Sequence, residues 1–144
     1  KNPPPVQIVK VDYPKREAAK IVEAYYKVPS TTDYNGIYKG KYIDFEAKET
    51  KVLNFPFQNI SEHQIKHLER IINHQGIAFV IIAFTSLNEV YLIDASYIIH
   101  DYYHGTRKSM TYEKIKTYGH IIPMGYIPRL DYLKVVEQVY FKED

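Results

Sequence analysis

The sequence predicts an α/β protein in which helices flank a central β-sheet. The segment from Ile77 to Phe84 is continuously apolar and rich in β-branched residues, which indicates a central strand covered on both faces. The segment from Ser61 to Gly76 carries apolar residues at helical spacing, and residues 34–48 alternate in the manner of a hairpin. A chain with both kinds of element buries its apolar surfaces by packing helices on a sheet.

The composition restricts the class of protein further. A length of 144 residues suits one domain, and 45% hydrophobic with 25% charged residues is close to the globular average. The absence of cysteine excludes a disulfide scaffold, a thiolate zinc finger and a cysteine nucleophile. The longest apolar run, residues 77–84, is shorter than the roughly 20 residues that cross a bilayer, so we expect a soluble protein without a membrane partner. Because the net charge is only +2, a polyanion-binding surface must come from a local arrangement of charges.

A hairpin is predicted from Tyr34 to Lys48, with its turn at Gly40. Successive side chains of a strand point to opposite faces, so every second residue shares a face. In the second strand the apolar face carries Ile43, Phe45 and Ala47, and the charged face carries Asp44, Glu46 and Lys48.

The clearest helix is predicted after Ser61. Ser61 is a typical N-cap residue, and Gln64 follows three residues later, as in a capping box. The apolar stripe behind them ends before Gly76 and consists of Ile65, Leu68, Ile71 and Ile72. The other expected elements are an extended entry at residues 3–11, a loop with Asn54 and Pro56, a strand at 90–93, a helix at 95–103 capped by Asp94, a short helix at 112–116, a short strand at 121–122 and a last helix capped by Asp131.

Acidic and basic side chains are expected to meet at one end of the hairpin. A turn near Gly40 pairs residues whose numbers sum to about 80, so Asp33 should lie beside Glu46 to Lys48. Two carboxylates suit Mg²⁺, which prefers oxygen ligands and keeps several waters. Lys48 could offset the negative charge that develops on a phosphate under attack. The alternative is an ordinary solvated strand face.

Residues 30–50 read STTDYNGIYKGKYIDFEAKET, and this stretch closely resembles the RecU family of Holliday-junction resolvases. The likeness covers nearly the whole chain and includes residues 5–11, Phe55 and Pro56, Gln58 and Asn59, residues 63–65 and residues 128–132. The resemblance implies a restriction-endonuclease-like α/β fold: a mixed central sheet flanked by helices, with a stalk that projects near the active site. It also implies a homodimeric, Mg²⁺-dependent phosphodiesterase in which Mn²⁺ can substitute.

The same resemblance implies a role for each residue of the motif. Asp33 and Glu46 would be catalytic metal ligands, and Thr31 and Gln64 would complete the metal environment. Lys48 would stabilise the transition state or position the attacking water. Two alternatives stay open, because the capping box explains Gln64 equally well and an ordinary turn explains Thr31.

Candidate DNA-binding residues lie on both sides of the motif. Tyr25 and Tyr26 resemble the family's stalk, where a ring could stack at the open centre of a junction, although a buried tyrosine pair is an equal alternative. The basic residues that could follow a phosphate backbone are Lys39, Lys41, Lys51, Arg107 and Lys108, with Lys114 and Lys116 beyond them. Scattered lysines more often only solvate a surface. His63 and His67 share a helix face without a third metal ligand, so we expect surface histidines there.

We therefore expect a Mg²⁺-dependent endonuclease that cuts opposed strands of a Holliday junction in recombination and repair, leaving 5′-phosphate and 3′-hydroxyl ends. A homodimer suits the near two-fold symmetry of four-way junction DNA, and a recombinase or branch-migration protein is a further expected partner. The alternatives are a nuclease of this fold that cuts other DNA, and a junction-binding or recombinase-regulating module without catalysis. The expected location is the cytoplasm, at the nucleoid.

Residues 1–144 are expected to form a single nuclease domain. The family has further residues, including an N-terminal helix, before the proline-rich start, and we expect that segment to be missing here. Residues 51–55 and 104–106 are also shorter than the family's pattern, either because the loops are trimmed or because residues are left out of the chain. DNA contacts of these two loops therefore stay open.

Overall fold

Five strands form one mixed sheet in the computed structural model, which describes residues 34–123 and 132–141. The strands are β1 (Tyr34–Tyr38), β2 (Lys41–Thr50), β4 (Ile77–Phe84), β5 (Glu89–Asp94) and β7 (His120–Ile121), in the order β1-β2-β4-β5-β7. The pair β2 and β4 is parallel and the other neighbouring pairs are antiparallel. The apolar strand β4 is thus central, as predicted, because it is paired on both edges and covered on both faces.

The strands β1 and β2 form the predicted hairpin. A two-residue turn joins them, in which Lys39 and Gly40 have φ angles of 52° and 81°. Positive φ at both positions gives the turn a twist that matches the twist of the flanking strands. Tyr34 lies opposite Phe45, which agrees with the register expected for a turn near Gly40.

The connection from β2 to β4 contains a strand where the sequence predicts a loop. Residues Asn54–Pro56 form β3, which pairs antiparallel with β6 (Ser109–Thr111) in a separate two-stranded sheet. The predicted loop at Asn54 and Pro56 is therefore wrong. Three residues are too few to show a periodic pattern, and β3 forms because a distant part of the chain supplies its hydrogen bonds and buries Phe55 against Met110.

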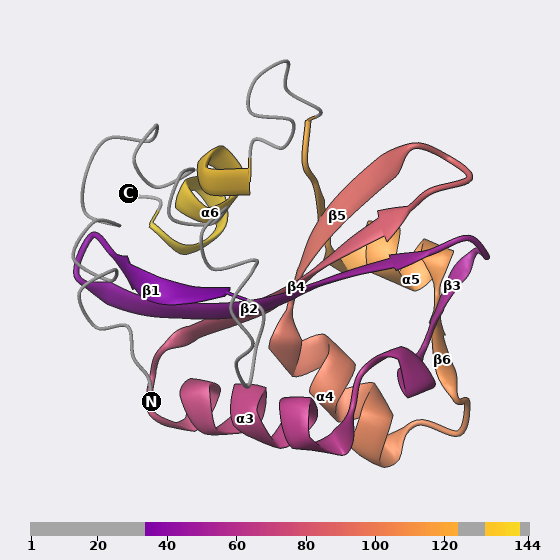
Figure 1. Ribbon diagram of the computed structural model, residues 1–144, viewed down its shortest axis with the longest axis horizontal. Coiled ribbons are helices and arrows are strands. Elements are labelled where there is room, and N and C mark those ends of the chain that lie inside the picture. The colour runs from indigo at the N-terminus through magenta and orange to yellow at the C-terminus, as the bar shows by residue number, and fades with distance from the viewer. Residues whose placement is uncertain (1–33, 124–131, 142–144) are drawn as a thin grey trace.

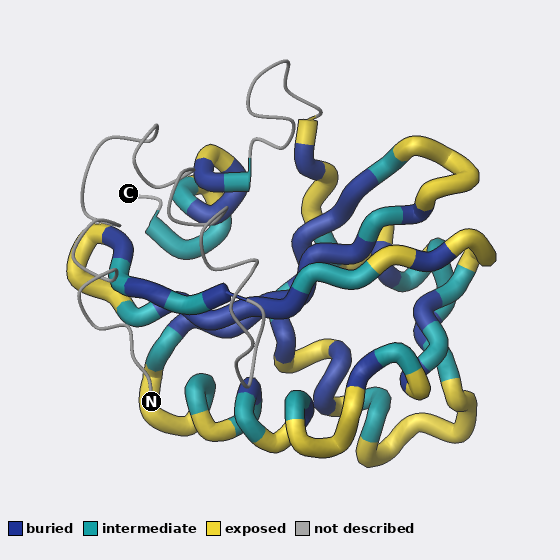
Figure 2. Tube along the Cα trace, in the orientation of Figure 1, coloured by how far each residue is buried: buried dark blue, intermediate teal, exposed yellow. Residues whose placement is uncertain are grey.

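Helices cover both faces of the sheet within the described part of the chain. They are the 3₁₀ turn η2 (Phe57–Asn59) and the helices α3 (Glu62–Asn73), α4 (Ala95–His104), α5 (Tyr112–Tyr118) and α6 (Tyr132–Tyr140). Figure 1 shows α6 on one side of the sheet and α3 and α4 on the other, and Figure 2 shows buried strands between them. The predicted caps Ser61 and Asp94 both accept backbone hydrogen bonds, so these helix starts are confirmed. Residues 3–11 and the cap Asp131 lie outside the described residues.

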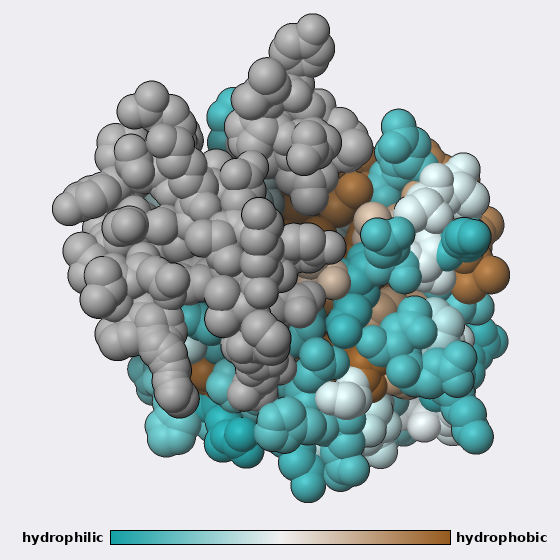
Figure 3. Space-filling view, in the orientation of Figure 1, coloured by the Kyte–Doolittle hydropathy of each residue, from teal (hydrophilic) through white to brown (hydrophobic). Residues whose placement is uncertain are grey.

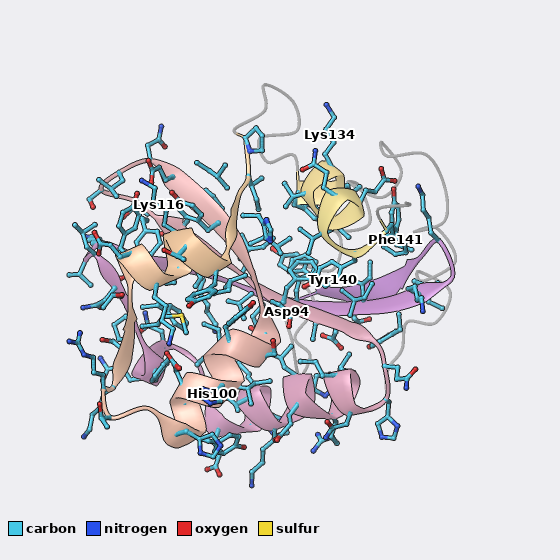
Figure 4. The ribbon with its side chains drawn as sticks, turned by 180° about the vertical axis from the view of Figure 1, so that it is seen from behind. Asp94, His100, Lys116, Lys134, Tyr140 and Phe141 are labelled. Atoms are coloured by element: carbon cyan, nitrogen blue, oxygen red, sulfur yellow. The ribbon has the colours of Figure 1, made fainter. Side chains whose placement is uncertain are left out.

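A row of aromatic rings fixes α6 against the sheet. Tyr34 stacks on Phe45 and Phe45 on Phe79, with ring centroids 4.6 Å apart in both pairs, and Phe79 stacks on Tyr140 of α6 at 5.9 Å. The Tyr140 hydroxyl donates a 2.5 Å hydrogen bond to Asp94, and the two side chains lie close together in Figure 4. Burial and the Asp94 carboxylate raise the pKa of Tyr140 well above its ordinary value, so this hydroxyl remains a donor.

The other face of the sheet packs on α3 and α4 and carries the charged side of β2. Its apolar cluster joins Ile65 and Leu68 of α3, Val80 and Ile82 of β4, and Ile98 of α4. No described helix has the length and apolar character needed to cross a membrane. The stalk expected around residues 25 and 26 falls outside the described residues.

Candidate active site

The charged face of β2 is buried rather than solvated. The side chains of Asp44 and Glu46 have no exposed surface, and Lys48 is 21% exposed. Burial follows from the topology, because β2 has β1 on one edge and β4 on the other, while α3 lies over this face. Carboxylates are rarely buried so completely unless they are hydrogen-bonded or bind a cation. A solvated strand face therefore does not describe Asp44 and Glu46.

Glu46, Lys48 and Gln64 form one cluster between β2 and α3. Gln64 Nε2 donates to Glu46 Oε1 at 3.1 Å. Lys48 Nζ donates to Gln64 Oε1 at 3.4 Å and lies 3.6 Å from Glu46 Oε1. The second oxygen of Glu46, Oε2, is also buried. One carboxylate, one ammonium and one amide thus meet at the first turn of the helix, where Lys48 is partly exposed and Glu46 is completely buried.

Gln64 forms the predicted capping box and also contacts Glu46 and Lys48. Gln64 Oε1 accepts a 3.1 Å hydrogen bond from the Ser61 backbone N–H, while the Gln64 backbone N–H donates to Ser61 Oγ at 3.1 Å. This is the predicted capping box. The cap holds the amide oxygen toward Ser61 and Lys48 and turns its nitrogen toward Glu46. The capping box therefore orients Gln64 within the cluster.

We expect Ser61→Ala to lower the free energy of unfolding by about 1 kcal/mol, because the first turn of α3 loses its N-cap acceptor. Ser86→Ala is the matched control, since it removes the same hydroxyl from an exposed position between β4 and β5. Urea unfolding of the full chain measures both variants. A loss of equal size in the control, or no loss in Ser61→Ala, would contradict a stabilising cap.

A second contact between β2 and α3 lies next to this cluster, and the sequence analysis missed it. His67 Nε2 lies 2.9 Å from Asp44 Oδ2, and the Tyr42 hydroxyl donates to the same oxygen at 2.9 Å. The expectation of a surface histidine is wrong for His67, whose side chain is only 21% exposed, while His63 is exposed as expected. The available signal was spacing: His67 follows Gln64 by three residues on a helix, and Asp44 precedes Glu46 by two on a strand.

His67→Leu should lower the free energy of unfolding by about 2 kcal/mol, because the completely buried Asp44 loses a partner but keeps Tyr42. In His67→Gln the amide can still donate to Asp44, so about half of that loss or less is expected. Urea unfolding compares the two variants with the native chain. Equal losses in both would mean that packing of the ring, and not its bond to Asp44, stabilises this contact.

The residues of the cluster fit a divalent cation such as Mg²⁺. Carboxylate oxygens are the hard donors that this ion prefers, and Glu46 supplies them from a rigid strand. Gln64 Oε1 already accepts hydrogen bonds from the Ser61 N–H and from Lys48, so Gln64 would complete the surroundings of the ion through water. Within residues 34–123 and 132–141, no three His, Asp or Glu side chains gather as a metal-binding group. The predicted ligands Thr31 and Asp33 lie outside the described residues, so the described part holds only Glu46 and Gln64 of the predicted set.

The basic residues predicted to bind DNA that the structure describes are spread over the hairpin turn, both ends of β2 and the loop before β6. Lys39, on the hairpin turn, forms a 2.6 Å ion pair with Glu137 of α6. The remaining four are exposed, at the start of β2, just after β2 and before β6: Lys41, Lys51, Arg107 and Lys108. Tyr25 and Tyr26 lie outside the described residues. Lys114 of α5 forms an ion pair with Asp101 of α4, and Lys116 lies over the Tyr112 ring within α5, so both lysines already have partners on the protein.

Comparison with known proteins identifies the family of this chain. The family model described as Recombination protein U matches residues 1–138. A Holliday junction resolvase RecU of Geobacillus sp. (strain WCH70) is 59% identical, and proteins of the same name from Bacillus cytotoxicus and Geobacillus thermodenitrificans are 57% identical. Each alignment covers 98% of this chain and 72% of the relative. The chain therefore belongs to the RecU family.

Proposed function

We propose that this chain is an endonuclease that resolves Holliday junctions by hydrolysing phosphodiester bonds in opposed strands. The observation that carries the proposal is the buried Glu46 carboxylate, held by Gln64 at 3.1 Å with the Lys48 ammonium 3.6 Å away. An acidic residue followed two positions later by a lysine is the motif that resembles the RecU nucleases. Relatives of 57–59% identity bear the name Holliday junction resolvase.

Glu46 and Asp33 would hold Mg²⁺, with Thr31 and Gln64 completing its surroundings directly or through water. When bound, this ion would supply positive charge to the phosphate and lower the pKa of a water molecule. The proposal requires the register that pairs Tyr34 with Phe45 to continue by one residue, so that Asp33 faces Glu46. Gln64 orients the Glu46 carboxylate, and the capping box in turn orients Gln64. Mn²⁺ would occupy the same oxygen donors.

Lys48 would act on the substrate directly. Its side chain is partly exposed to solvent, and its hydrogen bond to Gln64 and its contact with Glu46 limit the positions of its ammonium. A preorganised positive charge stabilises the negative charge that builds up on the attacked phosphate without a cost of reorganisation. The reaction would leave 5′-phosphate and 3′-hydroxyl ends.

The chain would act as a homodimer on four-way junction DNA, because two matched cuts need two sites related by two-fold symmetry. Residues 1–144 would form one nuclease domain in this dimer. A recombinase or branch-migration protein would be its partner in the cytoplasm, at the nucleoid.

Cleavage of labelled four-way and linear duplex DNA, with and without Mg²⁺, tests this function. We expect paired cuts in opposed strands of the junction, no cuts in the linear duplex of the same sequence, and no reaction in EDTA. Cleavage of both substrates at equal rates would indicate a nuclease of the same fold with another substrate. Tight junction binding without any cleavage would indicate a binding or regulatory module.

A further inference from the structure

A groove of about 730 Å³ lies away from the Glu46 cluster, between the β3–η2 segment and the loop before β6. The residues that matter for its chemistry are Asn54, Gln58, Tyr102, Thr106, Arg107 and Lys108. In Figure 3 hydrophilic side chains cover this lower right part of the molecule, where Figure 1 places η2, the end of α4 and the loop that leads to β6. The groove is open to solvent along its length and too large for a single small anion.

The lining of the groove is cationic and polar. Arg107 and Lys108 are exposed, and neither forms an ion pair with any acidic side chain of the described residues. The other polar lining groups are amides and hydroxyls, and no described Asp or Glu lines the groove. In contrast, Lys39 and Lys114 are ion-paired with carboxylates. The positive charge of this groove is therefore available to a ligand.

The loop that carries these cations is held in place by backbone contacts. The Phe57 N–H donates to the Lys108 carbonyl at 2.9 Å, and Pro56 pairs with Ser109 in the β3–β6 sheet. The rings of Phe57 and Tyr102 meet edge to face, 5.9 Å apart, beneath the groove. Because the backbone of Lys108 and Ser109 is held to β3 and η2, a ligand would bind with less ordering of the loop than a free loop requires.

A neighbouring hollow of about 360 Å³ shares Thr106 and Arg107 with the groove. This hollow is lined by a carboxylate, Asp101. Asp101 accepts hydrogen bonds of 2.8 and 3.0 Å from Lys114 and lies 3.4 Å from His100. Burial alone would raise the pKa of Asp101, but the hydrogen bonds and charges of Lys114 and His100 lower it overall. This carboxylate is therefore already neutralised by Lys114 and does not oppose a polyanion at Arg107.

We propose that this groove binds the sugar–phosphate backbone of a DNA arm, at a distance from the site of cleavage. Two cations suit phosphates, while amides and hydroxyls suit phosphate and sugar oxygens, and such contacts position DNA without reading its sequence. The segment that lines the groove at Asn54 and Gln58 continues directly into Ser61 and Gln64. A DNA backbone bound in the groove would therefore lie along the chain segment that leads to Gln64, the residue that contacts Glu46. The inference rests on the proposed function, because it assigns a second contact to the same junction substrate.

The test measures junction binding by the full chain in Ca²⁺, over a range of salt concentrations. The double variant Arg107→Gln/Lys108→Gln should bind the junction on the order of tenfold more weakly near physiological salt. The slope of log K against log salt should fall by about 1.8, since each lost phosphate contact removes about 0.9.

Lys66→Gln/Arg70→Gln is the matched control, since it removes the same charge from exposed positions of α3 outside the groove. An unchanged affinity and salt slope in the Arg107/Lys108 variant would overturn the proposal that the groove binds DNA, but would leave the resolvase proposal intact. That result would favour an acidic protein partner at the groove instead. Equal weakening in both variants would also overturn it, as an unspecific charge effect. If the native chain bound the junction without cutting it, only the proposed nuclease function would be refuted. The comparison of junction binding between the variants would still test whether the groove binds DNA.

Discussion

Glu46→Gln is expected to reduce junction cleavage at least about a thousandfold, equivalent to roughly 4 kcal/mol of transition-state stabilisation. The substitution keeps the shape of the side chain and removes the negative charge that would bind Mg²⁺. Gln64 and Lys48 now contact a neutral amide in place of a carboxylate. Because the glutamine oxygen can still accept from Gln64 Nε2 and Lys48 is partly exposed to solvent, the free energy of unfolding should fall by no more than about 2 kcal/mol. Single-turnover cleavage in Mg²⁺ measures the effect.

Glu49→Gln is the matched control for this prediction. Glu49 lies in the same strand, is exposed and begins the second Glu-x-Lys pair of the sequence, so the same charge is removed three residues away. We expect its cleavage rate to stay within about twofold of the native rate. Junction binding in Ca²⁺ should survive in both variants. Cleavage by Glu46→Gln within tenfold of the native rate would show that this carboxylate has only a structural role.

Lys48→Met is expected to slow the chemical step by about a hundredfold to a thousandfold, because a positioned positive charge next to the phosphate is lost. The methionine keeps most of the apolar stem, so packing between β2 and α3 should change little. The Mg²⁺ concentration that gives half-maximal rate should shift by less than about threefold, since lysine is not a metal ligand. Single-turnover rates over a Mg²⁺ titration separate the two effects.

Lys66→Met is the control for the removal of a lysine. Lys66 is exposed on α3, where it forms a surface ion pair with Glu62. Its single-turnover rate should equal the native rate. If Lys48→Met is as fast as this control, Lys48 does not act on the substrate. If its rate falls only because more Mg²⁺ is needed, then Lys48 acts through the geometry of Glu46.

Local patterns predicted the hairpin, α3 and the central strand, because each is determined by short-range rules. The turn at Gly40 needs positive φ, the capping box needs two residues three apart, and β4 needs an uninterrupted apolar run. Alternation along β2 likewise predicted that Asp44, Glu46 and Lys48 share one face. The short strand β3 was not, because its pairing depends on residues 109–111 and leaves no periodicity in three residues.

The family of this chain is evident from a likeness that extends over residues 1–138, and the charged residue types on one face of β2 follow from alternation along that strand. Only the tertiary structure decided that Asp44 and Glu46 are buried, that His67 reaches Asp44, and that Lys39 is bound to Glu137 while Arg107 and Lys108 have no described acidic partner. The physical reason is that burial and charge pairing are set by which element covers a face. That covering element, α3 over β2 or α6 beside the hairpin, comes from a distant part of the chain.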